Sequence, residues 1–283
     1  SPTYRAYRTY RACMTFYNPP HPHTLHAAMS LPRLAPGIVP ALMAWMLYGL
    51  ITFVIQSSSG ISYLDWFRTA ANAWRTGVLS LAVGSVVLLG WLAITRWDHL
   101  WRDPRRLPVS GVMKAAMGFW WAAIALRLAG VDWQAVPLDL LLAVVVSGVL
   151  VGFAEETLFR GFVLRALREG GRAESSAALW TAVCFGLFHL PNVLMGTGAL
   201  GVIQVFIAAL SGSVLYVFRR HTGRLWPAML AHGAWDISTF LAGGYAQPWL
   251  TATTLPMLGL SVLVGIVVLA NIVRGDRHVV MLP

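Results

Sequence analysis

Charged residues are scarce in this 283-residue sequence: Asp, Glu, Lys and Arg make up 11% of it, whereas hydrophobic residues make up 57%. A typical soluble domain carries roughly 25% charged residues, so this composition excludes an ordinary soluble globular protein. The sequence instead holds repeated apolar runs, each long enough to cross a hydrocarbon core of about 30 Å. These features predict a membrane protein, with no room for a large soluble domain beside the membrane spans.

Cysteines and acidic residues are also few. Cys13 lies in a polar stretch and Cys184 in an apolar run, so no disulfide framework is predicted. Lys and Arg number 21 against 11 Asp and Glu, which gives a net charge of +10. The basic residues lie in short patches between apolar runs, as they do in the cytoplasmic loops of membrane proteins. We therefore expect these charges to lie in cytoplasmic loops of a protein surrounded by a lipid bilayer, and we expect no nucleic acid partner.

The apolar runs define eight segments, and the predicted fold class is all-α, a polytopic membrane helix bundle of about eight transmembrane helices. The segments lie at about 34–56, 76–95, 112–130, 137–160, 175–190, 199–218, 226–243 and 252–273. Basic residues are concentrated in alternate loops, which predicts that both termini are cytoplasmic. The short loops and the Arg- and Trp-rich composition favour a bacterial inner membrane.

The domain organisation expected from this pattern is simple. Residues 1–28 are rich in Tyr, Arg, Pro and His and are predicted to be a disordered N-terminal extension. Residues 29–283 are predicted to form a single transmembrane domain.

Six of the ionisable residues in the apolar segments form a group on three segments, and a charge inside the membrane costs at least a few kcal/mol and usually marks a functional site. They are Glu155, Glu156, Arg160, His189, His232 and Asp236. Pairs of residues four positions apart project from one face of a helix. Such pairs are Glu156 with Arg160, Phe185 with His189, and His232 with Asp236. If the three faces meet, carboxyl groups and imidazoles line one small cavity.

The same residues form three motifs. Glu155-Glu156-Thr157-Leu158-Phe159-Arg160 matches Glu-Glu-x-x-x-Arg, Phe185-Gly186-Leu187-Phe188-His189 matches Phe-x-x-x-His, and His232-Gly233-Ala234-Trp235-Asp236 matches His-x-x-x-Asn/Asp. Their order and their placement on successive apolar segments resemble the CPBP family, which includes CAAX prenyl proteases of the Ras-converting type and bacteriocin-processing, Abi-type membrane proteins. The resemblance covers roughly residues 137–243, which would form the catalytic core.

This resemblance implies an intramembrane glutamic endopeptidase that uses neither a metal nor another cofactor. In such an enzyme Glu155 would be the general base that activates water, and His189 would hold and polarise that water. His232 and Asp236 would stabilise the oxyanion. Supporting roles would fall to three further motif residues: Glu156, Arg160 and Phe185.

The chemistry leaves one question about position 236. Peptide hydrolysis needs a base, a water and donors directed at the developing oxyanion. An Asn at this position would donate a hydrogen bond, whereas an ionised Asp cannot. Two readings of Asp236 therefore stay open: it is protonated and donates, or it keeps His232 as an imidazolium that donates.

Other functions are also compatible with the sequence. A non-catalytic membrane scaffold, an immunity protein or a transporter would use the same polar cluster for binding or for proton movement. A zinc-dependent membrane hydrolase would use Glu155, His189 and His232 as ligands. For a protease, the expected substrate is a peptide or a membrane-protein segment. Counting along the segments places His189 near the outer end of its helix and His232 nearer the inner end, a difference in depth of several residues.

Overall fold

The structure, a computed structural model, describes residues 34–281, and in that range it contains helices and connecting segments but no strand. The extension predicted at residues 1–28 lies outside the described residues. The long helices are α1 (Ile38–Ser58), α3 (Leu79–Thr95), α4 (Gly111–Ala129), α5 (Leu138–Glu156), α7 (Glu174–Leu187), α8 (Ala199–Thr222), α9 (Trp226–Tyr245) and α10 (Pro248–Gly275). The shorter elements are η2 (Tyr63–Asp65), α2 (Ala70–Ala73), η3 (Trp74–Val78), η4 (Thr157–Val163), α6 (Leu164–Glu169) and η5 (Leu190–Val193).

The predicted helix bundle is confirmed, and each of the eight apolar segments corresponds to one long helix. Within residues 34–281, seven helical stretches are long and apolar enough to cross a membrane, which supports an integral membrane protein. The eighth long helix, α9, carries His232 and Asp236 and is not among these seven. It packs against α5, α4 and α8, so other helices share in covering its polar side chains.

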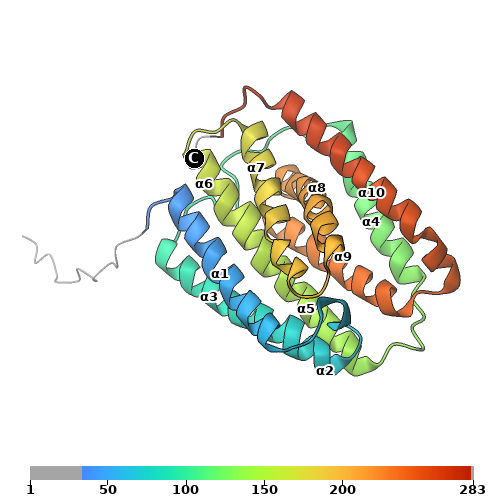
Figure 1. Ribbon diagram of the computed structural model, residues 1–283. Coiled ribbons are helices and arrows are strands. Elements are labelled where there is room, and N and C mark those ends of the chain that lie inside the picture. The colour runs from blue at the N-terminus through green and yellow to red at the C-terminus, as the bar shows by residue number, and fades with distance from the viewer. Residues whose placement is uncertain (1–33, 282–283) are drawn as a thin grey trace, which may run out of the picture. The chain divides into compact units, whose positions relative to one another are not determined.

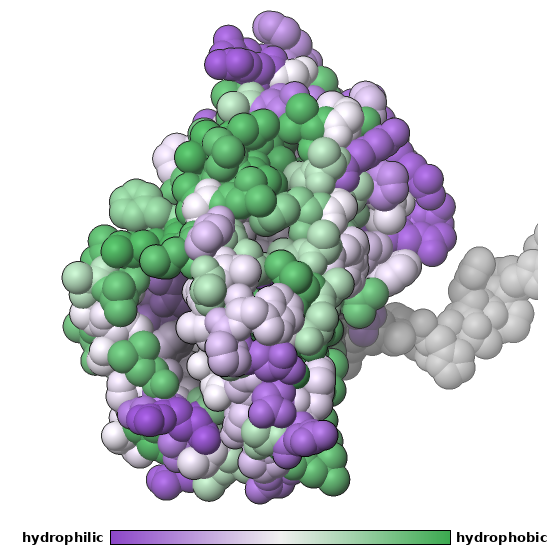
Figure 2. Space-filling model, turned by 90° about the vertical axis from the view of Figure 1, so that its right-hand side faces the viewer, coloured by the Kyte–Doolittle hydropathy of each residue, from purple (hydrophilic) through white to green (hydrophobic). Residues whose placement is uncertain are grey.

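The helices form three groups (Figure 1). On one side α1 lies beside α3, and on the other side α4 lies beside α10, with α5, α7, α8 and α9 between these pairs. The outer helices expose many large apolar side chains, and Figure 2 shows such residues gathered over a wide zone of the face near α4 and α10. This surface suits contact with lipid chains, and the central helices are left to hold the polar groups.

One continuous helical stretch, Leu138–Glu169, carries the paired glutamates. Directly after Glu156 its winding changes, and Thr157–Val163 form a π-helix in which every residue is buried. Such π-helical turns are rare and are frequently found at functional sites. Here the π-helix contains Arg160, the predicted partner of Glu156, so the change of winding lies at the polar cluster.

Glycines allow α5 and α9 to approach closely. A Cβ atom added at Gly152 would lie 2.3 Å from the carbonyl oxygen of Met229, and one added at Gly233 would lie 2.5 Å from the carbonyl oxygen of Gly148. Gly148 and Gly152 form a Gly-x-x-x-Gly pattern, which is typical of tight helix contacts in membranes. This contact brings the end of α5 that carries Glu155 beside the part of α9 that carries the second histidine motif.

Besides the glycine contact, a network of buried ion pairs stabilises the bundle. It lies at the end of the bundle where α6, α7 and α8 meet the connection between α3 and α4. Arg168 donates to both carboxylate oxygens of Glu174, at 3.0 and 2.6 Å, and to Asp103 at 2.9 Å. Arg219 donates twice to Asp103, at 3.0 and 2.6 Å, and also to the main-chain carbonyl of Arg160. Burial by itself would raise the pKa of Asp103, but the two guanidinium groups outweigh burial and lower that pKa below its ordinary value. Through the bond from Arg219 to the Arg160 carbonyl, the network therefore holds the π-helix in place.

The glycine contact can be tested by a matched pair of substitutions. Alanine normally stabilises a helix by about 1 kcal/mol relative to glycine. Gly118 lies in α4, where an added Cβ meets nothing within 4 Å, so Gly118→Ala should leave the melting temperature unchanged or raise it. Gly152→Ala should lower the melting temperature in detergent and reduce the folded yield, because its Cβ would meet main-chain oxygen. A Gly152→Ala protein that melts at or above the wild-type temperature would contradict the close approach of α5 and α9.

Candidate active site

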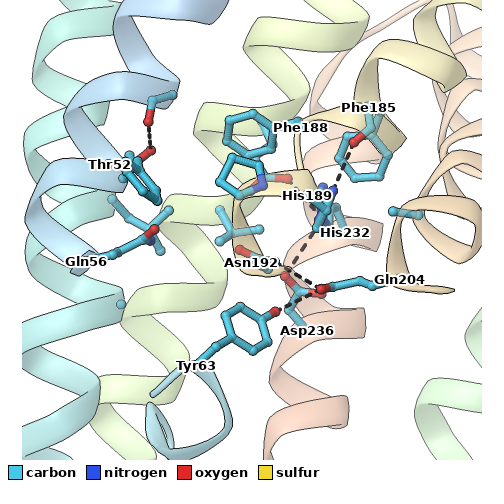
Figure 3. A pocket seen from close by; sticks show the side chains of 18 of the residues that line it. Thr52, Gln56, Tyr63, Phe185, Phe188, His189, Asn192, Gln204, His232 and Asp236 are labelled. Carbon is cyan, nitrogen blue, oxygen red and sulfur yellow. Dashed lines mark hydrogen bonds and ion pairs between the residues drawn. The ribbon is translucent and has the colours of Figure 1, made fainter. Parts of the chain in front are cut away.

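A cavity of about 520 Å³ opens inside the bundle, and the predicted catalytic side chains line it (Figure 3). Glu155 comes from α5, His189 from the segment after α7, and His232 and Asp236 from α9. Phe185 also lines the cavity. Much of the remaining wall is aromatic, including Trp45, Tyr48, Phe53, Trp66, Phe67, Trp120 and Phe188. The helix faces that carry the three motifs therefore meet at this cavity.

Glu156 lies directly behind the cavity wall and joins two motifs. Its Oε1 atom accepts one hydrogen bond from Arg160 Nη1 at 2.7 Å and another from His232 Nδ1 at 2.8 Å. The side chains of Glu156 and Arg160 are completely buried. Since a carboxylate only accepts hydrogen bonds, Nδ1 of His232 carries the hydrogen and Nε2 is left to face the cavity.

Arg160 has further contacts that keep it in place. Its Nη2 atom donates to the carbonyl of Gly212 at 2.8 Å, and its guanidinium lies 4.4 Å from the ring centre of Phe185. A Cβ atom at Gly212 would lie 2.9 Å from Arg160 Nη2, so the glycine makes room for the guanidinium. The predicted i,i+4 pair of Glu156 and Arg160 is thus present and is tied to both α7 and α8.

Three polar groups surround one point in the cavity. His232 Nε2 lies 3.9 Å from Glu155 Oε2 and 3.8 Å from Asp236 Oδ2. Both separations are too long for a hydrogen bond, but a single water molecule can bridge separations of this size. Glu155 Oε2 is buried and has no hydrogen-bond partner among residues 34–281. The arrangement can therefore place a water between a carboxylate, an imidazole and a second carboxyl group.

His189 reaches the same cavity because α7 ends early. The helix stops at Leu187, and the chain then turns through η5, so His189 lies at a turn and not within a straight helix. Its Nδ1 lies 2.9 Å from the carbonyl oxygen of Phe185 and must donate to it, which leaves Nε2 as an acceptor. The Phe185 ring lies edge-on between the two imidazoles, with ring centres 5.1 Å from His189 and 5.5 Å from His232. Both imidazoles thus line one cavity on the Phe185 ring, although counting along straight helices predicts different depths for them.

Arg127 is a charged residue of α4 that the motif search missed. Its guanidinium lies 3.9 Å from the ring centre of Trp235, the neighbour of Asp236 in the chain. Trp235 stacks on Trp120 at 4.0 Å, and Trp120 donates to the carbonyl of Ala231 at 2.9 Å. The signal was available in the sequence, because Arg127 lies within the apolar segment 112–130 as the other buried charges lie within theirs.

A metal site was one of the alternatives left open by the sequence. Within the part of the chain that the structure describes, no group of three or more His, Cys, Asp or Glu side chains is arranged to hold a metal ion. The zinc-dependent alternative therefore has no ligand set among residues 34–281.

The fold and the cavity define a class: a polytopic membrane protein with a site of ionisable side chains buried among its central helices. Within that class, residues 137–238 match the family described as Rce1-like, type II CAAX prenyl endopeptidase. The match covers a little over a third of the chain, includes all three motifs and confirms the resemblance on which the sequence prediction was based. It implies intramembrane protease activity. No curated protein and no solved structure gives a match.

The contribution of Glu156 to the stability of the protein can be tested without an activity assay. Removing one charge of a buried ion pair typically costs about 3–5 kcal/mol, whereas an exposed pair contributes only about 0–1 kcal/mol. Glu156→Gln should therefore lower the unfolding free energy by a few kcal/mol, because Arg160 would remain buried beside a neutral side chain. Unfolding in detergent with a chemical denaturant measures this difference.

Glu169→Gln is the matched control. Glu169 also pairs with an arginine four positions away, Arg165, but its side chain is 38% exposed. Its replacement should change the unfolding free energy by less than about 1 kcal/mol. Equal effects of the two substitutions would show that Glu156 does not have the central role described above.

Proposed function

We propose that this protein is an intramembrane endopeptidase that hydrolyses a peptide bond with a water molecule activated by Glu155. The observation that supports this most directly is the Glu155 Oε2 atom, which is buried, has no partner among the described residues and lies 3.9 Å from His232 Nε2. The family match independently supports a protease. The expected substrate is a peptide or a membrane-protein segment that enters the cavity between the helices.

In the proposed reaction Glu155 takes a proton from the water, and the water oxygen attacks the carbonyl carbon of the substrate. A C–O bond forms, and the carbonyl oxygen becomes an oxyanion that accepts a hydrogen bond from His232 Nε2–H. Glu155 then gives its proton to the amide nitrogen as the C–N bond breaks. Glu156 supports this role of His232, since its carboxylate accepts the Nδ1 hydrogen and favours an imidazolium.

His189 and Asp236 act on either side of this centre. The free Nε2 atom of His189 would accept the second hydrogen of the water and so orient its lone pair toward the substrate. Asp236 would stabilise the imidazolium of His232 across the 3.8 Å separation, which is the second of the two readings that the sequence left open. This role needs a polar group at position 236, but Glu156 already supplies a carboxylate to the same imidazole.

We further propose that the protein lies in a bacterial inner membrane with both termini cytoplasmic. The connections at one end of the bundle carry a set of exposed arginines, which suits the cytoplasmic side. They are Arg96, Arg102, Arg105, Arg106, Arg172 and Arg224. Residue Leu34 lies at the same end, because its carbonyl accepts from Trp97 at 2.8 Å, and the segment after α10 lies there too, because Glu174 donates to Val279 at 2.7 Å.

The role of Glu155 is tested by Glu155→Gln, which keeps the shape of the side chain but removes the base. A positioned general base typically contributes 10²- to 10⁴-fold, so kcat should fall by at least about 100-fold. The measurement is a comparison of cleaved membrane proteins in cells that carry wild type or Glu155→Gln, followed by kinetics on the purified proteins. Glu169→Gln, on the same helical stretch but outside the cavity, should retain wild-type cleavage.

Two results would overturn this proposal. Wild-type cleavage by Glu155→Gln would favour the scaffold, immunity or transporter alternatives, in which the polar cluster does not catalyse. Activity that a chelator abolishes and zinc restores would favour the zinc alternative over a metal-free glutamic mechanism.

Position 236 allows a sharper test of how the oxyanion site works. Asp236→Asn should reduce kcat by less than about tenfold, because Glu156 remains to stabilise the His232 imidazolium. Asp236→Leu should reduce kcat much further, because it places an apolar group against Nε2. Rate measurements over a range of pH on both variants check this, and loss of all activity in Asp236→Asn would show that the Asp236 carboxylate itself is required.

A further inference from the structure

Three polar side chains joined by hydrogen bonds line the cavity close to Asp236 (Figure 3). Asn192 Nδ2 donates to Gln204 Oε1 at 3.0 Å, and Gln204 Nε2 donates to the hydroxyl oxygen of Tyr63 at 2.9 Å. The three residues come from three separate elements, η5, α8 and η2, and all three line the cavity. Neither the motifs nor the proposed hydrolysis step uses them.

The direction of these hydrogen bonds leaves one donor free. Because Gln204 donates to the Tyr63 oxygen, the hydrogen of that hydroxyl is available to another acceptor, and no hydrogen bond donated by it is present among residues 34–281. Figure 3 shows the Tyr63 side chain directed toward Asp236, at the polar end of the cavity. Burial raises the pKa of Tyr63 to about 12, and the nearby carboxyl groups of Asp236 and Glu155 add to this effect. Tyr63 therefore remains a neutral donor at physiological pH.

Hydrogen bonds to main-chain carbonyl groups hold Tyr63 and Asn192, the two outer members of this group of three, in position. The amide of Tyr63 donates to the carbonyl of Met195 at 2.8 Å, and the hydroxyl of Thr197 donates to the carbonyl of Asn192 at 2.7 Å. Tyr63 and Asn192 are thus both fixed to the same loop, which follows α7. A donor whose own supports are fixed in this way loses little freedom when it binds a ligand.

The rest of the cavity indicates which group of a bound ligand would accept a hydrogen bond from Tyr63. The walls are mostly apolar and aromatic, so a bound peptide can place apolar side chains against them but finds few donors there for its main-chain carbonyl groups. Each buried carbonyl without a partner costs about 1–3 kcal/mol. The free Tyr63 hydroxyl is a donor that can satisfy one of them.

We propose that Tyr63, held by Gln204 and Asn192, donates a hydrogen bond to a main-chain carbonyl of the bound peptide and so sets which peptide bond lies next to Glu155. This subsite rests on the proposed function, because it assumes a peptide in the cavity. It binds the peptide beside the bond that is cut and takes no part in the bond-breaking step. Tyr63 is therefore a binding and positioning residue.

The experiment compares Tyr63→Phe with Tyr245→Phe. Tyr245 lies at the end of α9, packs in a separate apolar cluster and does not line the cavity, so it is a matched control. The probe is one fluorescein-labelled peptide, chosen from a set of short Leu- and Ala-rich sequences as the tightest binder of the full-length Glu155→Gln protein in lipid nanodiscs. In that Glu155→Gln background, Tyr63→Phe should weaken binding about tenfold, which equals about 1.4 kcal/mol, while Tyr245→Phe should leave it unchanged.

Gln204→Leu is a second variant that should also weaken peptide binding, but by an indirect route. It removes the support of Tyr63, so it should weaken binding to a similar extent, and the double variant with Tyr63→Phe should be no weaker than either single variant. In the active protein Tyr63→Phe should raise KM about tenfold with little change in kcat, and it should also move the cut to neighbouring bonds of the same peptide.

Three outcomes would overturn the subsite. They are unchanged binding in Tyr63→Phe, a fall in kcat with KM unchanged, and absence of binding by every peptide in the set. The binding measurement does not depend on cleavage. If Glu155→Gln still cleaves, the proposed mechanism fails while the Tyr63 comparison still decides whether the subsite exists.

Discussion

The rest of the polar site depends on one oxygen atom, Oε1 of Glu156, which accepts hydrogen bonds from both Arg160 and His232. This shared acceptor joins α9 to the π-helical turn that follows α5. It also decides which nitrogen of His232 faces the cavity, because the other one is bound to Glu156. Without it the Arg160 guanidinium would be buried with no carboxylate paired to it, and such burial costs several kcal/mol. The conformation of the site and the stability of the central helices are therefore linked.

Two further constraints keep this arrangement in place. The contact between Gly152 and the Met229 carbonyl lets α5 and α9 approach so closely that their side chains reach each other. Arg219 binds the main-chain carbonyl of Arg160 and is itself neutralised by Asp103. In a hydrocarbon environment polar groups must be satisfied within the protein, so these interactions provide the partners that water provides in a soluble protein. The bundle is thus held by close packing on one side of the glutamates and by ion pairs on the other.

The cavity combines a mostly apolar wall with polar groups that have two different roles. Glu155, His232 and Asp236 surround a point suited to a water molecule, and Tyr63, which is directed toward Asp236, offers a neutral donor beside it. This division suits the hydrolysis of a peptide in a membrane, where side chains are easily accommodated and main-chain carbonyls are not. It also separates the step that binds the peptide from the step that cuts it. The aromatic walls, with Phe185 between the two imidazoles, limit where a peptide can lie.

The sequence by itself determined the eight helices, because hydrophobic runs of membrane-spanning length are a local property of the chain. It also determined the pairing of Glu156 with Arg160, since a spacing of four residues places two side chains on one helix face. What the tertiary structure decided depends on residues that are distant along the chain. Examples are the partnership of Asp103 with Arg219, the bond between Tyr63 and Gln204, and the turn that brings His189 into the cavity. No local pattern encodes these contacts, because each requires the helices to have packed before the side chains can meet.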